Sequence, residues 1–506
     1  MIMPERIETR KRSIEQRLNG GLPDDMSQPM FSASNIHYEL AERTHAISYG
    51  GIGLIHQLAK ESGLVEAIDR KLHLLKIHIP YHESDHVLNI AYNALCGGRC
   101  FQDIELRRND ETFLDALGTD RIPDPTTEGD FCRRFVSSYY IERLHEAIDE
   151  ARVKVWDRQP KPFFQQATID MDGHLIATNG ECKEGMDIAY EGTWGYHVLL
   201  LSLAETGEVL RLVNRSGNRP SHEGAAPQCD RVIRLCREAG FERIVLRGDT
   251  DFSQTAHLDR WNREDVVFQF GYDETPNLVK IASLLPENEW EKLKRPPRYE
   301  VSTKPRERPD NVKDRIVCER EFDVLRLKSE EVAEFDYQPT KCRQSYRMIV
   351  VRKNISVEKG DRRLFDDVRH FFYITNDRDS TKAEVVFSCN DRCNQENLIE
   401  QLSNGVRAFQ APVDTLLSNW AYMVMTSLAW NLKAWWALWL PESGRWATKH
   451  RAEKQQVLRM EFRTFLNSFM NIPCQIIRTG RRLVYRLLNW NPWLGVFRRL
   501  AVELHC

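Results

Sequence analysis

The sequence lacks the cysteine and histidine patterns that would predict a structural zinc site or a disulfide framework. Its 12 cysteines are scattered, and only two pairs lie close together, Cys96/Cys100 and Cys389/Cys393. No CxxC motif or neighbouring histidine accompanies either pair. The N-terminal stretch MIMPERIETRKRSIEQR also lacks an apolar segment, so we expect no secretory signal. Scattered cysteines without such a signal are typical of reduced thiols in a cytoplasmic protein.

The sequence has no strong net charge, no internal repeat and no low-complexity tract. The formal net charge is −3, which neither indicates nor excludes a nucleic-acid partner, because local patches decide that. Hydrophobic residues make up 42% and charged residues 29%, as in ordinary globular proteins. The most apolar run, residues 416–440, is rich in tryptophan but carries Asn419, Asn431 and Lys433. We therefore expect a buried helix there and no membrane span.

The 506 residues are enough for about three domains. Residues 1–36 are charged and interrupted by proline and glycine, which predicts a mobile arm. Residues 37–158 show apolar positions at three- and four-residue spacing, which predicts a helical N-terminal domain. Such a domain would either bind DNA or only pack against the rest of the chain, and the sequence leaves both open.

From residue 159 to 274 the pattern changes to short apolar runs separated by helical segments. The predicted order is three strands, a helix, a strand, a helix and a strand. The first strand lies in QQATIDMDGHLIAT, and the fourth is RIVLRGD. This order matches the first part of a ribonuclease H-like α/β core, in which function lies at the carboxyl ends of the strands.

Residues 275–379 begin with a polar, proline-rich stretch and continue with β-rich runs such as RIVCEREFDVLRL and YRMIVVRKN. They predict a β-rich domain inserted into the core. Residues 380–440 would complete the core with a helix that carries an acidic residue. Residues 441–506 are predicted to be helical and basic, with RTGRRLVYRLL as an amphipathic helix that turns Leu483, Val484, Leu487 and Leu488 inward.

Three acidic residues are candidates for a metal site. Asp172 lies on the first predicted strand, with Asp170 two residues earlier, and Asp249 follows the fourth strand at a glycine. Glu396, on the later helix, is the best placed third member. Phosphodiester cleavage is commonly assisted by two divalent ions roughly 3.5–4 Å apart, and Mg²⁺ prefers carboxylate oxygens.

Each acid also has a purely structural interpretation. Asp172 could belong to a turn, and Asp249 could be an ordinary acid at the end of a strand. Glu396 has rivals in Glu384 and Glu400, and its spacing from Arg392 also fits a surface ion pair of under ~1 kcal/mol. Taken together, the order and separation of the three acids favour the metal site.

These motifs resemble those of the DDE transposases of bacterial insertion sequences. IDMDGHL resembles their first-aspartate motif, and VLRGDTDF resembles the second. The resemblance spans roughly residues 37–490 and is strongest to a group with a β insertion before the catalytic glutamate. That group carries a signature of Tyr, Arg, Glu and Lys. Here the four positions hold Cys389, Arg392, Glu396 and Ser403, so the tyrosine and lysine are missing.

The resemblance implies Mg²⁺- or Mn²⁺-dependent DNA cleavage at transposon ends and strand transfer into target DNA. It implies two ions held by Asp172, Asp249 and Glu396, and a homodimer assembled on the terminal inverted repeats of double-stranded DNA. The protein would act in the bacterial cytoplasm, at the nucleoid. Two alternatives are a structure-selective nuclease on the same core and a non-catalytic DNA-binding relic of a transposase.

Basic residues are the expected contacts to DNA phosphates. Arg392 matches the arginine of the signature and lies four residues before Glu396, on one helix face. Arg407 continues that face and could replace the missing lysine. The C-terminal region adds further candidates, which the alternative interpretation treats as a solvated helix face: Arg478, Arg481 and Arg482.

Overall fold

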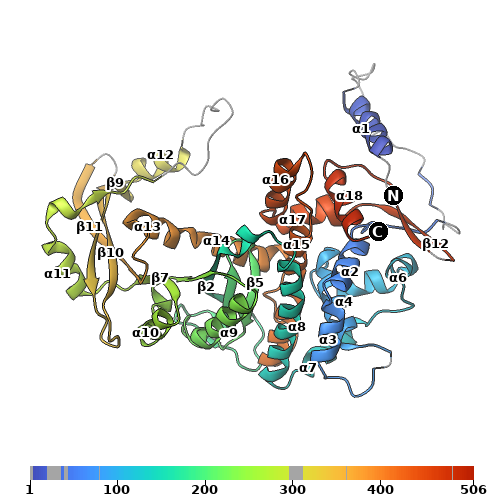
Figure 1. The fold of residues 1–506 in the computed structure, drawn as a ribbon, viewed down its shortest axis with the longest axis horizontal. Coiled ribbons are helices and arrows are strands. Elements are labelled where there is room, and N and C mark those ends of the chain that lie inside the picture. Colours follow the sequence, from blue (N-terminus) through green and yellow to red (C-terminus); the bar gives the residue numbers. More distant parts are fainter. Residues whose placement is uncertain are drawn as a thin grey trace. The chain divides into compact units, whose positions relative to one another are not determined.

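The structure, a computed structural model, describes residues 4–19, 36–38, 44–78, 80–295, 311–359, 362–480 and 482–505. The chain divides into two compact units. Unit 1 contains Met1–Phe163, His174–Arg219 and Asn397–Cys506, and unit 2 contains Phe164–Gly173 and Pro220–Glu396. The chain thus crosses between the units four times. Figure 1 shows the elements in sequence colours.

Unit 2 is built on a mixed sheet that begins with the first part of strand β2. In spatial order its strands are β2 (Gln166–Ala177), β6 (Arg243–Gly248), β7 (Val266–Tyr272), β11 (Arg362–Thr375), β10 (Tyr346–Lys359), β9 (Asp323–Tyr337) and β8 (Glu291–Lys292). The first three run parallel, and the remaining pairs are antiparallel. The apolar run Ile244–Leu246 in β6 is buried, as expected for a parallel strand inside an α/β unit.

The order of elements predicted between residues 166 and 272 is confirmed. Strands β2, β4 (Trp194–Leu203) and β5 (Glu208–Val213) are followed by α9 (Ala225–Glu238), β6, α10 (Thr255–Arg263) and β7. The short strand β3 (Asp187–Ile188), between β2 and β4, was not predicted. The remaining helices of unit 2 are α11 (Pro276–Leu284), α12 (Val312–Glu319), α13 (Lys382–Asp391) and α14 (Cys393–Glu400), of which α14 runs on into unit 1. The fold is therefore a mixed α/β architecture with a large mixed sheet.

The β-rich runs after residue 320 extend this sheet, because β11 pairs with β7 over Gln269–Tyr272. The start of the first run, RIVCE, was predicted as strand but belongs to helix α12. Its apolar residues Val312 and Ile316 are four apart, which suits a helix better than the two-residue period of a strand. The proline-rich stretch 296–310 lies outside the described residues.

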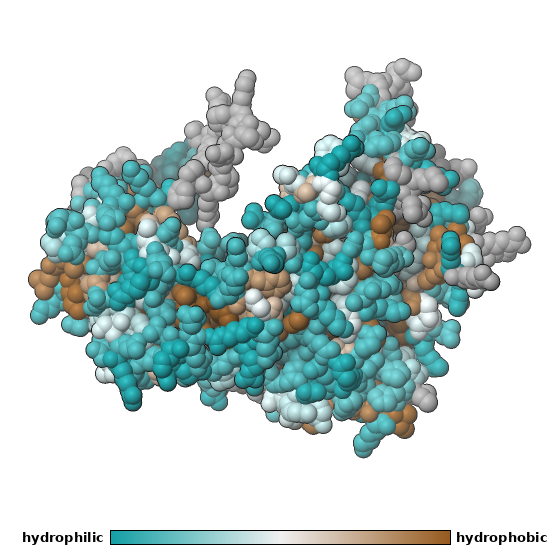
Figure 2. Space-filling model, viewed as in Figure 1, coloured by the Kyte–Doolittle hydropathy of each residue, from teal (hydrophilic) through white to brown (hydrophobic). Residues whose placement is uncertain are grey.

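Unit 1 is mostly helical. Its helices include α1 (Pro4–Leu18), α2 (Ile52–Glu61), α3 (Leu64–Lys71), α4 (Glu83–Leu95), α5 (Glu105–Arg108), α6 (Glu111–Leu117), α7 (Pro125–Arg133), α8 (Ser138–Trp156), α15 (Leu416–Leu438), α16 (Ala447–Leu458), α17 (Phe462–Phe465) and α18 (Leu494–Glu503). Within the predicted arm, residues 4–18 form α1, and residues 20–35 lie outside the described part. On the face shown in Figure 2, hydrophilic residues cover most of the surface and hydrophobic ones gather in small patches.

Helix α15 is the centre of unit 1 and contacts α2, α4, α7, α8, α16 and β5. Every residue from Ser418 to Leu438 is buried, so the predicted buried helix is confirmed. Among the helices of the described ranges, none is both long and apolar enough to cross a membrane. Two of its indole groups, those of Trp430 and Trp435, find acceptors on β5 and the turn before it. Trp430 donates to the Gly207 carbonyl over 2.7 Å, and Trp435 donates to Glu208 over 2.8 Å.

The prediction that the C-terminal region is entirely helical, with RTGRRLVYRLL as an amphipathic helix, is wrong. That segment forms a β-hairpin of β12 (Cys474–Thr479) and β13 (Arg482–Leu487), and β12 also pairs with β1 (Ala46–Ile47). β-Branched and aromatic residues around the glycine of its turn favour strand pairing. Leu483, Val484 and Leu488, expected inside, are 38–44% exposed.

Candidate active site

Asp249 follows strand β6 at a tight turn. Its carboxylate accepts the backbone N–H of Asp251 over 3.0 Å and begins a short 3₁₀ turn, Thr250–Phe252. A Cβ at Gly248 would lie 2.7 Å from the Cβ of Phe252, so glycine is required where the strand ends. The turn thus holds Asp249 at the carboxyl end of a buried parallel strand, as the sequence predicts.

Asp172 lies beside Asp249 because of the strand register. Asp170 in β2 is paired with Arg247 in β6. Asp172 follows Asp170 by two residues, and Asp249 follows Arg247 by two residues. One Asp172 oxygen accepts the N–H of Gly173 over 2.8 Å. Parallel pairing therefore brings together two acids that lie 77 residues apart in the sequence.

Burial dominates the electrostatics of the two carboxyl groups. It raises the pKa of Asp172 to about 6, with the Arg392 charge opposing the shift and the Asp249 charge adding to it. Burial likewise raises the pKa of Asp249, again against the lowering effect of Arg392. Two half-desolvated carboxylates that repel each other form a place where a cation is favoured.

Arg392 provides positive charge at this place. It lies at the junction of α13 and α14, and its guanidinium donates to Asp172 over 2.8 Å. Both side chains are largely buried, at 19% and 15% exposure. The oxygen donors of Asp172 and Asp249 fit a hard divalent cation such as Mg²⁺, which would have to share them with this arginine.

The position of Glu396 differs from that of the aspartates. It lies in the first turn of α14, four residues after Arg392, and its side chain is exposed. In the part of the chain that the structure describes, no three His, Cys, Asp or Glu side chains lie close enough to hold a metal ion. The structure therefore brings Asp172, Asp249 and Arg392 together, and leaves Glu396 outside this group.

The sequence did not reveal the ion pair between Asp170 and Arg247, which lie two residues before Asp172 and Asp249. Arg247 donates two hydrogen bonds to Asp170, over 2.5 and 2.8 Å, and a third to the Ser388 carbonyl of α13 over 2.7 Å. Asp170 and Arg247 are both buried. Asp170, proposed at first as a neighbour of the metal site, is thus held by an arginine. The only signal in the sequence was the pairing of these positions, which requires the strand register.

The predicted basic residues occupy different settings. The expectation that Arg407 continues the helix face of Arg392 is wrong, because α14 passes into a π-helical turn at Gln401–Gly405. Arg407 follows it in a left-handed conformation with φ 60°. Ser403, at the position of the missing lysine, lies 3.4 Å from His174. Arg478 and Arg482 are on the C-terminal hairpin, and Arg481 lies outside the described residues.

A cavity of about 420 Å³ adjoins the Asp249 turn in unit 2. Thr250 and Asp251, which follow Asp249 directly, line it together with His222, His257 and Lys341. The polar surface of the site therefore continues past the carboxylate pair.

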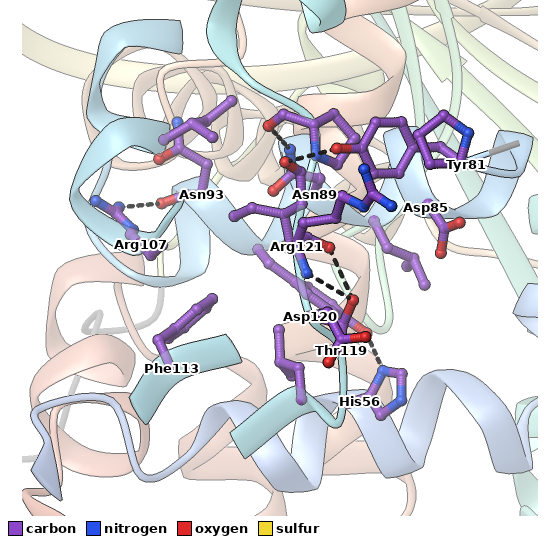
Figure 3. Close-up of a pocket in the computed structure, with 17 residues that line it drawn as sticks. His56, Tyr81, Asp85, Asn89, Asn93, Arg107, Phe113, Thr119, Asp120 and Arg121 are labelled. Atoms are coloured by element: carbon purple, nitrogen blue, oxygen red, sulfur yellow. Dashed lines mark hydrogen bonds between the residues drawn. The ribbon is translucent and has the colours of Figure 1, made fainter. Parts of the chain in front are cut away.

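A second cavity, of about 380 Å³, lies among the N-terminal helices of unit 1 (Figure 3). Its polar side chains bond to neighbouring segments. His56 lies 3.1 Å from the Tyr92 hydroxyl, and Asn89 donates to the Pro123 carbonyl over 3.1 Å. These bonds join α2, α4 and the following loops, so the cavity belongs to the packing of the helical region.

Comparison with known proteins assigns the chain to a protein family. None of the curated proteins compared with the chain is significantly similar to it in sequence. Among solved structures, it is similar to the piggyBac transposase in a cryo-EM synaptic complex with hairpin DNA, with 9% identity and a TM-score of 0.35. That match covers 84% of this chain and 81% of the other. The family model described as "Transposase DDE domain group 1" matches residues 39–505, and the chain therefore belongs to this family of DDE transposases.

Proposed function

We propose that this protein is the transposase of an insertion sequence, which cleaves DNA at the transposon ends and joins the ends to target DNA. One observation carries the proposal beyond family membership. Asp172 and Asp249 meet at the ends of parallel strands in a partly desolvated place, and Arg392 lies against them. Carboxylates with raised pKa values in such a setting are typical of functional sites.

The chemistry follows from these side chains. Asp172 and Asp249 would hold Mg²⁺ or Mn²⁺, and two such ions would activate water and stabilise the leaving oxygen during phosphodiester cleavage. Arg392, displaced from Asp172, would bind a phosphate of the cleaved strand. Water would be the first nucleophile. The freed 3′-hydroxyl would be the second, in an in-line displacement without a covalent enzyme intermediate.

Glu396 is the proposed third ligand. Helix α13 ends at Asp391, and Arg392 separates it from α14, which begins at Cys393. To act as a ligand, the exposed Glu396 carboxylate would have to turn toward the aspartates, and this junction is where α14 could rotate. The proposal thus includes a ribonuclease H-like arrangement of the core, with the strands after residue 320 as an extension of the sheet before the glutamate helix.

The proposed partners are the two transposon ends and the target, all double-stranded DNA. Joining two ends in one complex requires two active sites, so we infer a homodimer on DNA in the bacterial cytoplasm. Arg407 remains a proposed contact near the cleaved end, although its backbone position differs from that of the signature lysine. Its replacement by alanine should weaken binding of the transposon end.

The test is a cleavage assay on DNA that carries the inverted repeats flanking the coding region. The wild type should cut at the repeat ends with Mg²⁺, and Asp249→Ala should lose about 10²–10³-fold in rate or more. Asp323→Ala, at an exposed position at the start of β9 outside the site, is the matched control and should stay active. Equal cleavage by wild type and Asp249→Ala would refute the metal site. Cleavage of branched DNA without preference for the repeats would support the structure-selective nuclease instead.

A further inference from the structure

The C-terminal region has a local charge that the whole chain does not show. Residues 462–502 contain seven arginines and no aspartate, glutamate or lysine, although the chain as a whole carries a net charge of −3. The arginines are Arg463, Arg478, Arg481, Arg482, Arg486, Arg498 and Arg499. Arg499 of this stretch pairs with Glu453, so what attracts a polyanion is the arginines that no carboxylate neutralises.

The hairpin β12–β13 presents part of this charge from a fixed base. Tyr485 in β13 donates its hydroxyl to the Ala116 carbonyl of α6 over 2.6 Å. A Cβ on Gly53 of α2 would lie 2.6 Å from the Tyr485 ring, so this glycine is needed to seat the ring. On β12, Cys474 and Ile476 are buried. The end of the hairpin near its strand termini is therefore anchored on the helices of unit 1 (Figure 1).

The other end of the hairpin is exposed and basic. The Arg478 side chain is 72% exposed. It forms a weak ion pair with Asp115, at a distance of 3.7 Å. Arg482 is exposed beside the turn, and Arg486, which pairs with Gln475 near the anchored end, is exposed as well. Within the described ranges, neither has a carboxylate at ion-pair distance, and Arg486 donates to the neutral Gln475 over 3.1 Å. Their charges are therefore free to meet a ligand.

We propose that this hairpin is a β-ribbon that enters the major groove of double-stranded DNA. A two-stranded ribbon fits the width of the major groove, whereas the minor groove is about half as wide. Arginine binds phosphates and the O6 and N7 atoms of guanine through its planar fork. Val484, 38% exposed and on the same face of β13 as Arg482 and Arg486, suits contact with thymine methyl groups. The inference deepens the proposed function, on which it rests for the nature of the polymer, and it names a contact outside the carboxylate site.

The experiment measures duplex binding by full-length protein without divalent metal. Fluorescence anisotropy with a labelled duplex of the transposon end gives the association constant at several salt concentrations. Arg482→Gln/Arg486→Gln should weaken binding at least tenfold near 0.1 M salt. The slope of log K against log salt should become shallower by about 2, because each lost phosphate contact removes about 0.9.

Two variants serve as controls. Arg482→Lys/Arg486→Lys keeps the charge and should retain most of the salt slope, which separates loss of contact from misfolding. Arg234→Gln/Arg263→Gln removes two exposed arginines from α9 and α10 and should bind like the wild type. Unchanged affinity and slope in the Arg482→Gln/Arg486→Gln variant would overturn the proposal, as would equal binding of a single strand.

The groove is tested separately. Methylation of guanine N7, in the major groove, should interfere with binding at positions that the hairpin contacts, whereas a minor-groove ligand should not displace the protein. Displacement by the minor-groove ligand, without interference at N7, would refute the groove assignment. Since binding is measured without metal, failure of the Asp249→Ala cleavage test would leave this result unaffected, and the two proposals can fail independently.

Discussion

At the scale of single residues, the positive charge of Arg392 partly offsets the negative charges of Asp172 and Asp249. The pKa of Asp172 is about 6 in the folded protein, above the ordinary value of 3.8. Between these two pH values the folded state binds more protons than the unfolded state, so stability falls as pH rises through this window. Above about pH 6 the charged carboxylate destabilises the metal-free protein, as expected of a site built for a cation.

Asp172→Asn should therefore stabilise the metal-free protein at pH 7. The gain should be about 1–3 kcal/mol in the free energy of unfolding, and it should vanish near pH 4, where Asp172 is protonated in the folded state. Thermal melting in a chelator at the two pH values measures it. Mg²⁺ should then raise the melting temperature of the wild type more than that of the variant.

Asp251→Asn is the control for this measurement. Asp251 is exposed on the same turn, so its replacement should change stability by less than about 0.5 kcal/mol. A change in stability on Asp172→Asn that is equal at pH 4 and pH 7 would contradict the raised pKa of this group.

The buried ion pair between Arg247 and Asp170 permits a second prediction at this scale. Arg247→Met leaves a buried carboxylate with no cation and should cost about 3–5 kcal/mol. Replacing both residues, as Asp170→Leu/Arg247→Met, should cost clearly less than the sum of the two single changes, because neither charge is then left alone. Denaturant unfolding of the four proteins gives the coupling energy. Strictly additive costs would mean that the pair is not coupled in the way that its hydrogen bonds indicate.

At the scale of elements, hydrophobic periodicity was informative wherever one face of an element is buried. Strands β2 and β6 and helix α9 were predictable because their apolar residues have a clear period and a glycine or acid marks their ends. The two aspartates were found for the same reason: each follows a recognisable strand. Parallel pairing of those strands then completed the group.

Other elements were set by contacts that the sequence does not display. Apolar residues at positions 483, 484, 487 and 488 fit a helix face as well as a strand, and the anchoring of Tyr485 on α2 and α6 accompanies the strand form. The π-helical turn at Gln401–Gly405 shifts the register by which Arg407 was placed. Such local departures arise from tertiary packing, so no window of neighbouring residues predicts them.

Helix α15 offers a prediction at this scale because it buries a lysine. Lys433 donates to the Leu458 carbonyl over 2.8 Å and lies 3.9 Å from the Trp430 ring. Desolvation lowers the pKa of this amine to about 7, from an ordinary value of 10.5. Between these values the unfolded state binds the extra proton, so stability due to this group rises with pH across that window.

Lys433→Met should remove this dependence. The free energy of unfolding of the wild type should therefore rise relative to that of the variant by up to roughly a few kcal/mol from pH 7 to pH 10. Denaturant unfolding at several pH values measures the difference. Lys449→Met, which replaces an exposed lysine of α16, provides the control. A difference that stays constant over this range would contradict the lowered pKa.

At the scale of the whole molecule, the division into two units does not follow the chain. Unit 2 takes its first strand from Phe164–Gly173, far from the rest of its sequence. That segment supplies Asp170, which pairs with Arg247, and Asp172, which meets Asp249. A fold of this kind explains why function depends on segments that no single stretch of sequence contains.

This arrangement predicts the behaviour of fragments. Residues 220–400 alone would expose the edge of β6 and leave Arg247 buried without its carboxylate, so we expect aggregation or unfolding without a cooperative transition. Joining residues 164–173 to this fragment through a flexible linker of about 15 residues should restore cooperative thermal unfolding, because the missing strand can pair again. The same fusion with Asp170→Leu should melt at a lower temperature or not cooperatively. Cooperative unfolding of residues 220–400 without the added strand would show that β2 is dispensable to unit 2.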